Sequence, residues 1–141
     1  MSLVLNRFDI AYGNIAEEVA KLSYCKRHKV GCVLVCDRRI IATGYNGTEP
    51  GVDNICEDEH GETLPGVVHA EINALRMAKS YGISVVACSA YVTHAPCINC
   101  AKELVKAGIK YVYYTNLTST GSKGLMYLTA NGVTVVHNWR H

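Results

Sequence analysis

The sequence is organised around His69-Ala70-Glu71, which is followed downstream by Pro96-Cys97-Ile98-Asn99-Cys100. The two motifs offer one imidazole, two thiols and one carboxylate that need not bind a metal. Three nitrogen and sulfur ligands with an open fourth position are typical of a catalytic zinc site, whereas a structural zinc site uses four protein ligands. We therefore predict that His69, Cys97 and Cys100 bind a catalytic Zn²⁺ ion, and that Glu71 remains free of it.

Glu71 lies two residues from His69 and is the expected proton carrier. A catalytic zinc ion lowers the pKa of a water molecule to about 7, which makes a nucleophile available at neutral pH. A carboxylate beside this water molecule can take a proton from it, pass the proton to a ring nitrogen and later protonate a leaving amine. H-x-E followed by P-C-x-x-C is the pattern of zinc-dependent nucleobase deaminases. A Cys-x-x-C pair alone would also suit a redox dithiol or half of a structural zinc site, but the upstream His-x-Glu favours deamination.

The hydrophobic pattern around the motifs predicts alternating helices and strands. Apolar residues at spacings of three and four predict a helix over residues 8–22. Helices are also predicted over residues 68–81, 96–108 and 124–131, and strands over residues 30–36, 40–45, 87–93, 111–115 and 133–137. The first two strands form an antiparallel hairpin, and the later helices imply right-handed parallel crossovers. We predict one α/β domain over residues 1–141, a three-layer α/β/α fold with a five-stranded mixed sheet.

This topology also explains how the two motifs meet. His69 and Cys97 both fall at predicted helix N-termini, where free N–H groups and the helix dipole favour anions. These conditions lower the pKa of Cys97 and keep both cysteines as metal-binding thiolates. A parallel crossover brings both helix N-termini to one end of the sheet, which is where α/β sheets bind ligands.

The composition is that of an ordinary globular domain. The chain has 141 residues, of which 49% are apolar and 18% charged, and its formal net charge is +2. This charge gives no case for a long nucleic-acid footprint, and no apolar stretch approaches the length of a membrane span. Residues 1–10 carry Asn6, Arg7 and Asp9 without an apolar run, so we expect no signal peptide.

Seven cysteines are many for this length. Without a signal peptide we expect a reducing cytoplasm, with several cysteines on metal and the others buried. Cys32 and Cys36 alternate with valines on the first strand and are interpreted as small buried hydrophobes.

Two loops favour a role in binding. The basic run over residues 23–29 is either a solvated connection or a source of cations for a phosphate. Gly44-Tyr45-Asn46-Gly47 ends the hairpin, and its glycines permit positive φ and a close approach to a ligand. The irregular segment over residues 48–68 is long enough to suggest a function, and its cysteine and histidine suggest that a metal holds it.

The chain resembles the deoxycytidylate (dCMP) deaminase family of the cytidine deaminase superfamily, and most of all its phage and viral members. The resemblance rests on Val30-Gly31, Gly44-Tyr45-Asn46-Gly47-Thr48, the Asp53-Asn54 to Cys56 region, His69-Ala70-Glu71-Ile72-Asn73-Ala74, Tyr91-Val92-Thr93 and Pro96-Cys97 with Cys100-Ala101-Lys102. It implies hydrolytic deamination of dCMP to dUMP, which feeds thymidylate synthesis.

The resemblance also implies how nucleotides bind. Asn46 is expected to contact the deoxyribose, and Ala70 and His94 to take part in substrate binding, although His94 could equally be a loop histidine in water. Phosphate candidates are Lys26, Arg27 and Lys29, with Ser122 and Lys123 as weaker candidates across a subunit boundary. Gly44, Tyr45, Asn46 and Gly47 are expected to bind a regulatory nucleotide. The family implies activation by dCTP and inhibition by dTTP in a homo-oligomer, with a hexamer favoured.

Some members of this family carry a second, structural zinc ion. Cys25, Cys56 and His60 occupy comparable places here, and His28 or Glu57 would be the fourth ligand. The short linker leaves open that this site is missing or rearranged. Tyr111, Tyr113 and Tyr114 are interpreted as strand and interface residues rather than as a platform for base stacking.

Other functions are compatible with the same motifs. The chain could act on dCTP as well as dCMP, or on cytidine, a free base or an adenosine in tRNA, although tRNA binding favours a more basic surface than +2. A zinc-dependent nucleotide-binding module without turnover is the non-enzyme alternative. Glu71 distinguishes an enzyme from a binding module, because a binding module needs no free carboxylate beside an open zinc position.

Overall fold

A computed structural model describes residues 6–139 of the chain. The elements follow in the order α1 (Arg7–Ala20), β1 (Gly31–Cys36), β2 (Arg39–Tyr45), α2 (Ala70–Ser80), β3 (Ser89–His94), α3 (Ile98–Ala107), β4 (Tyr111–Asn116), α4 (Gly121–Ala130) and β5 (Thr134–His137). This order is the predicted one. The largest difference lies at the start of α4, which begins three residues before Gly124, and the other boundaries differ by at most two residues.

The five strands form one mixed sheet in the order β2-β1-β3-β4-β5. β1 is antiparallel to both β2 and β3, whereas β3, β4 and β5 are parallel. β1 and β2 are joined by a tight turn in which Asp37 and Arg38 have φ of 51° and 62°, the left-handed conformation that two-residue hairpin turns require. The predicted five-stranded mixed sheet is confirmed.

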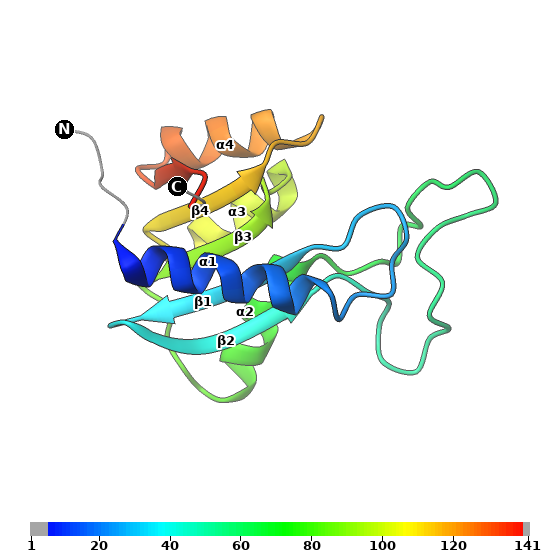
Figure 1. Cartoon of the computed structure of the whole chain (residues 1–141), viewed down its shortest axis with the longest axis horizontal. Helices are drawn as coiled ribbons and strands as arrows, with labels where there is room; N and C mark the ends of the chain where they lie inside the picture. The colour runs from blue at the N-terminus through cyan, green and yellow to red at the C-terminus, as the bar shows by residue number, and fades with distance from the viewer. Residues whose placement is uncertain (1–5, 140–141) are drawn as a thin grey trace.

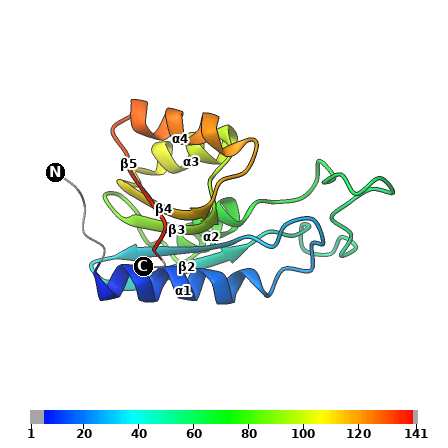
Figure 2. The same cartoon turned by 45° about the horizontal axis from the view of Figure 1, so that its top comes forward.

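Helices cover both faces of the sheet, so the side chains of β1 point alternately into two different apolar cores. Val33 and Val35 pack against Ala16 of α1, while Cys32 and Leu34 face the core formed with α2, α3 and α4. Figure 2 shows α1 below the sheet and α3 and α4 above it. The three-layer prediction is therefore confirmed.

The segment between β2 and α2 extends away from the sheet, on the same side as the loop between α1 and β1 (Figure 1). Gly44, at the end of β2, does not have positive φ. Its role is close packing: a Cβ atom there would lie 2.4 Å from the Ala70 carbonyl oxygen and 2.4 Å from the Ala74 nitrogen. The positive φ that the glycines of this turn would permit is not used, and Gly44 is required because α2 lies against the strand.

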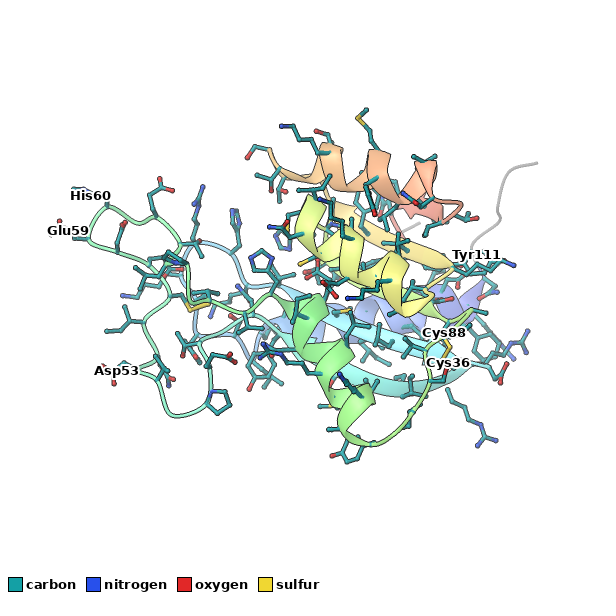
Figure 3. All side chains as sticks on the ribbon, turned by 180° about the vertical axis from the view of Figure 1, so that it is seen from behind. Cys36, Asp53, Glu59, His60, Cys88 and Tyr111 are labelled. Atoms are coloured by element: carbon teal, nitrogen blue, oxygen red, sulfur yellow. A yellow bond between two sulfur atoms is a disulfide. The ribbon has the colours of Figure 1, made fainter. Side chains whose placement is uncertain are left out.

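Four cysteines form disulfides, which corrects one prediction. Cys32 is fully buried and free, as expected of a small core residue. Cys36, however, is half-buried and bonded to Cys88, at the end of the sheet away from the long loop (Figure 3). Cys25 and Cys56 form the second disulfide. Sequence spacing alone missed both pairs, because their partners are distant in the chain.

Tyr111, Tyr113 and Tyr114 lie on β4, as predicted. Tyr113 is buried and stacks on Tyr91 of the neighbouring strand, with ring centroids 4.4 Å apart. No helix within residues 6–139 is long and apolar enough to cross a membrane. The cytoplasmic location stays a prediction.

Candidate active site and metal centre

Three potential metal ligands meet at one end of the sheet. His69 Nδ1 lies 3.1 Å from Cys100 Sγ and 3.5 Å from Cys97 Sγ. The three donor atoms all lie within 4.8 Å of one another. His69 is exposed, Cys97 is half-buried and Cys100 is buried, so the group is open on the His69 side.

The helices position two of these ligands at their first residues. His69 is the N-cap of α2 and Cys97 is the N-cap of α3, and both have extended backbone. Neither side chain makes a capping hydrogen bond to its own helix. The imidazole and the thiol are therefore available for a metal, and the predicted meeting of two helix N-termini is confirmed.

The donor set fits zinc. Tetrahedral zinc with the usual Zn–N and Zn–S bond lengths places its ligand atoms roughly 3.6 Å apart, close to the separations found here. The hydrogen bond from Cys100, helped by His69, lowers the pKa of Cys97 to about 3, while the same contact raises that of Cys100 well above its usual range. The two sulfurs therefore hold one proton between them. A zinc ion would displace that proton and bind both thiolates.

Glu71 lies in the first turn of α2 and is only 3% exposed. Burial is the main cause that raises the pKa of Glu71 from 4.5 to about 7, although its own backbone hydrogen bond and His69 oppose the shift. A carboxyl group with a pKa near neutrality can both accept and donate a proton at neutral pH. Glu71 therefore has the character of a general acid and base.

A cavity of about 240 Å³ opens in front of the ligand group. Its lining includes Ala70, Glu71 and Cys97, and the other lining residues are Arg27, His28, Val30, Asn46, Thr63, Val67, His69, His94, Ala95, Thr118, Ser119 and Thr120. The walls come from four segments: the loop before β1, the loop between β2 and α2, the end of β3, and the loop between β4 and α4.

Only one of the three predicted basic phosphate ligands lines this cavity. Arg27 does so, and its guanidinium pairs with Glu62 at 2.9 Å. Lys26 lines a separate cavity on the outer side of the loop. Lys29 donates its hydrogen bond to the Ser23 carbonyl oxygen instead.

Asn46 lines the cavity, but its side chain is largely engaged by the protein. Its Oδ1 atom accepts a hydrogen bond from the Val30 nitrogen at 2.9 Å, and its Nδ2 atom donates to the His28 carbonyl oxygen at 2.8 Å. Its own carbonyl oxygen accepts from the buried Ser23 hydroxyl at 2.9 Å. Asn46 thus holds the loop before β1 in place as well as facing the cavity.

The loop between β4 and α4 contributes hydroxyl groups that the sequence reasoning missed. Thr118, Ser119 and Thr120 line the cavity, whereas Ser122 and Lys123, the predicted residues of this region, do not. A hydroxyl-rich stretch directly after a parallel strand was the available signal, because ligands bind beyond the carboxyl ends of such strands.

Two glycines bring α4 onto the metal-ligand segment. A Cβ atom on Gly124 would lie 1.8 Å from the Pro96 carbonyl oxygen and 3.0 Å from the Cys97 carbonyl carbon. One on Gly121 would lie 2.6 Å from the Ala95 side chain. The start of α4 therefore packs directly on the backbone that presents Cys97.

The predicted second metal set is only partly assembled. Cys25 and Cys56 are bonded to each other, and the Glu57 carboxylate is the third potential donor of this group. Glu57 also accepts hydrogen bonds from the backbone nitrogens of residues 26 and 27. His60 lies beside Glu59 at the outer end of the loop, 78% exposed and outside the group (Figure 3). His28 lines the catalytic cavity, so of the two predicted fourth ligands only Glu57 is in place.

The predicted effector turn faces a different cavity. Gly44, Tyr45 and Gly47 line a hollow of about 640 Å³, together with Tyr24, Asn73, Arg76 and Tyr81. Asn73 of α2 donates a hydrogen bond to the Tyr45 carbonyl oxygen at 2.9 Å. Asn46, the next residue, lines the catalytic cavity instead. The turn therefore separates two cavities.

Comparison with known proteins identifies the class to which this fold and site belong. Residues 7–116 match the family described as the cytidine and deoxycytidylate deaminase zinc-binding region. The solved dCMP deaminase of the cyanophage S-TIM5, in complex with dCMP and dUMP, is similar, with 38% identity and a TM-score of 0.92 over 96% of this chain and all of that one. The chain belongs to the cytidine and deoxycytidylate deaminase family, as predicted.

Curated relatives agree with this assignment. The chain is 38% identical over 121 residues to ComE operon protein 2 of Bacillus subtilis, covering 83% of this chain. It is 35% identical over 121 residues to the deoxycytidylate deaminase of Mycobacterium phage D29, covering 76% of this chain and 93% of that protein. The chain spans 64% of the length of the Bacillus protein and 44% of two yeast relatives.

Proposed function

We propose that this chain catalyses the hydrolytic deamination of dCMP, which converts dCMP and water to dUMP and ammonia. The observation that carries the proposal is the buried Glu71 carboxyl, which lines the same cavity as two of the three potential zinc ligands, His69 and Cys97. The dCMP deaminase of the cyanophage, whose structure holds dCMP and dUMP, supports dCMP as the substrate.

Glu71 carries the protons of the reaction. When bound by His69, Cys97 and Cys100, Zn²⁺ supplies a Lewis acid that makes water nucleophilic near neutral pH. Glu71 accepts a proton from the water and passes it to the pyrimidine ring nitrogen as the water oxygen attacks the amine-bearing carbon. Glu71 next takes the remaining proton of the added hydroxyl group and gives it to the amine, so that the C=O bond forms as the C–N bond breaks and ammonia leaves. Its pKa of about 7 suits both directions of transfer.

The cavity walls suit the rest of the nucleotide. Ala70, His94 and Asn46 all line this cavity, which supports their predicted contacts with the substrate, Asn46 with the deoxyribose. Arg27 is the basic candidate for the phosphate, because its present partner Glu62 is exposed and such a surface ion pair contributes little stability. A phosphate would replace the Glu62 carboxylate as the acceptor. The hydroxyls of Thr118, Ser119 and Thr120 are further donors on the same cavity.

The turn between the two cavities supports regulation by a second nucleotide. Tyr45 and Asn46 are adjacent in the chain but face the outer and the catalytic cavity respectively. A nucleotide in the outer cavity would contact Tyr45 and shift the backbone that carries Asn46. We assign dCTP as the activator and dTTP as the inhibitor, with a homo-oligomer, preferably a hexamer, as the assembly. The enzyme would then supply dUMP for thymidylate synthesis.

The test is the loss of cytosine absorbance with dCMP, dCTP, deoxycytidine and cytidine in parallel, each with and without added dCTP or dTTP. Rapid loss with dCMP alone, changed by the triphosphates, is the expected result. Equal rates with dCMP and dCTP would support the same deamination chemistry and indicate that the phosphate pocket also accepts a triphosphate. No loss with any of them in zinc-loaded protein would contradict the proposal and favour another base, a tRNA or a binding module.

A further inference from the structure

Thr93 is a buried polar residue, 3% exposed, at the end of β3 beside His94. Its hydroxyl oxygen lies 3.1 Å from the Gly31 nitrogen, which donates a hydrogen bond to it. The same oxygen lies 2.9 Å from Nδ1 of His94. The Thr93 hydroxyl therefore connects the first residue of β1 with an imidazole that lines the catalytic cavity.

The hydrogen count of these contacts determines which nitrogen of His94 carries the proton. A hydroxyl has one hydrogen to donate, and Thr93 already accepts the Gly31 N–H group. If Nδ1 of His94 also donated to Thr93, the hydroxyl hydrogen would be left buried without an acceptor, which is unfavourable. The satisfied arrangement has Thr93 donating to Nδ1, so that the proton of neutral His94 is on Nε2.

The surroundings also favour the neutral imidazole. Burial, and then the neighbouring His28 ring at 5.5 Å between centroids, lower the pKa of His94. A doubly protonated ring would have to donate from Nδ1, which the Thr93 contact disfavours. Within residues 6–139, Nε2 of His94 has no hydrogen-bond partner from the protein.

Thr93 is also held firmly enough to orient the ring. Its carbonyl oxygen accepts hydrogen bonds from the Thr115 hydroxyl at 2.9 Å and from the Asn116 amide at 2.8 Å. Both donors lie at the end of β4, immediately before the hydroxyl-rich wall of the cavity. Thr93 thus joins β1, β3 and β4 at the edge where the cavity opens.

We infer that Thr93 is a positioning residue that fixes His94 as a neutral Nε2–H donor to an acceptor oxygen of the bound nucleotide. The inference rests on the proposed function for the identity of the ligand. The oxygen belongs either to the pyrimidine carbonyl or to the phosphate, because each can accept a hydrogen bond from an Nε2–H group.

Histidine nitrogen NMR on the zinc-loaded full chain tests the tautomer without any turnover. Long-range proton–nitrogen spectra of labelled protein at pH 7, with His94 assigned by a His94→Gln variant, should show the proton on Nε2. A proton on Nδ1, or a charged ring, would overturn the inference. This measurement on the unchanged chain needs no variant of Thr93 to fold.

Titration with dUMP and with deoxyuridine then identifies the acceptor. Movement of the His94 Nε2 signal with both ligands indicates the pyrimidine carbonyl, and movement with dUMP alone indicates the phosphate. A signal unmoved by dUMP, while other signals show dUMP bound, would overturn the donor role. A chain that binds no dUMP would contradict both the proposed function and the donor role, while the tautomer spectrum would still decide the role of Thr93.

Two matched variants connect the hydroxyl with catalysis. Thr93→Val removes the hydroxyl at nearly constant shape, and Thr93→Ser keeps it. Thr93→Val should raise KM about tenfold and leave kcat within about twofold, because a bond made equally to substrate and transition state affects binding alone. Thr93→Ser should restore both the KM and the Nε2–H tautomer. Equal kinetics for the two variants would overturn the inference.

Discussion

Gly124 of α4 lies against the carbonyl of Pro96, so close that a Cβ atom on the glycine would be 1.8 Å from that oxygen. The same Cβ atom would lie 3.0 Å from the carbonyl carbon of Cys97, a predicted zinc ligand. One contact therefore sets the position of α4 and that of the Cys97 thiol.

Gly124→Ala should displace α4 from this segment. Overpacking of a tight contact typically costs about 1–3 kcal/mol, so the free energy of unfolding should fall by that amount. Zinc content should fall as well, because Cys97 would shift from its partners. Thermal unfolding and metal analysis measure the two effects. Gly66→Ala is the matched control, since its Cβ would meet nothing within 4 Å. Equal zinc content in the two variants would contradict the prediction.

Glu71→Gln should abolish proton transfer while keeping the metal. All three zinc ligands remain, and the amide has nearly the same shape as the carboxyl group. Loss of a general acid and base typically lowers kcat by about 10²–10⁴-fold. The comparison is Glu103→Gln, an exposed residue of α3 that should keep full activity. Turnover by Glu71→Gln at the unchanged rate would remove Glu71 from the mechanism.

The buried carboxyl of Glu71 also predicts how stability depends on pH in protein stripped of metal. Its pKa is raised from 4.5 to about 7 in the folded chain, so the folded state holds the proton more tightly between these values. Stability should therefore fall as pH rises from about 4.5 to about 7, and level off above. The shift corresponds to about 3 kcal/mol. Denaturant unfolding of the wild type and Glu71→Gln at pH 5 and pH 8 measures it. Parallel pH profiles for the two proteins would count against this assignment.

Arg27→Ala should weaken the binding of dCMP through its phosphate. Loss of a hydrogen bond between charged groups should raise KM for dCMP by about 10- to 100-fold. Deoxycytidine, which has no phosphate, should be unaffected. Lys26→Ala is the matched control, because Lys26 does not line the catalytic cavity. If both substrates respond equally to Arg27→Ala, the phosphate contact is elsewhere.

The Cys25–Cys56 disulfide joins the two loops that form one wall of the cavity. Closing a loop of 31 residues contributes about 3–4 kcal/mol in the chain-entropy description. Cys25→Ser should therefore lower the unfolding temperature and raise KM. Cys36→Ser cuts the other disulfide, whose residues do not line the catalytic cavity, and should lower stability alone. The same KM for both variants would refute a role for the Cys25–Cys56 bond in the site.

Metal analysis of reduced protein tests the second zinc prediction on the same residues. Two zinc ions per chain after reduction would support binding by Cys25, Cys56 and Glu57 in place of the disulfide. A value near one would exclude that second site.

The predicted set of His69, Glu71, Cys97 and Cys100 could be recognised in the sequence because each of its two motifs is short and continuous. His69 and Cys97 each start a helix, and a parallel crossover places such starts at the same edge of a sheet. The parallel pairing of β3, β4 and β5 follows from the same rule, because a helix separates each of these strands from the next. The apolar alternation on β1 was likewise visible in the residues themselves.

The remaining features depend on the path of long loops, which residue spacing does not determine. Whether Cys56 meets Cys25 or His60 depends on how the segment between β2 and α2 turns back. Asn46 lines the cavity, but its hydrogen bonds to residues 28 and 30 exist only once the preceding loop has folded onto it. The close contact of Gly124 with Pro96 needs the final placement of α4.

Helices α2 and α3 begin with residues that give them no side-chain cap. Serine, threonine, aspartate or asparagine at either position would typically stabilise the helix by about 1 kcal/mol. The residues at these two sites are therefore not the ones that local folding preference favours. A descendant of this chain that lost catalysis would gain stability by replacing His69 with aspartate or Cys97 with serine. Sequence drift toward helix-capping residues at these positions is therefore a sign by which inactive relatives can be recognised.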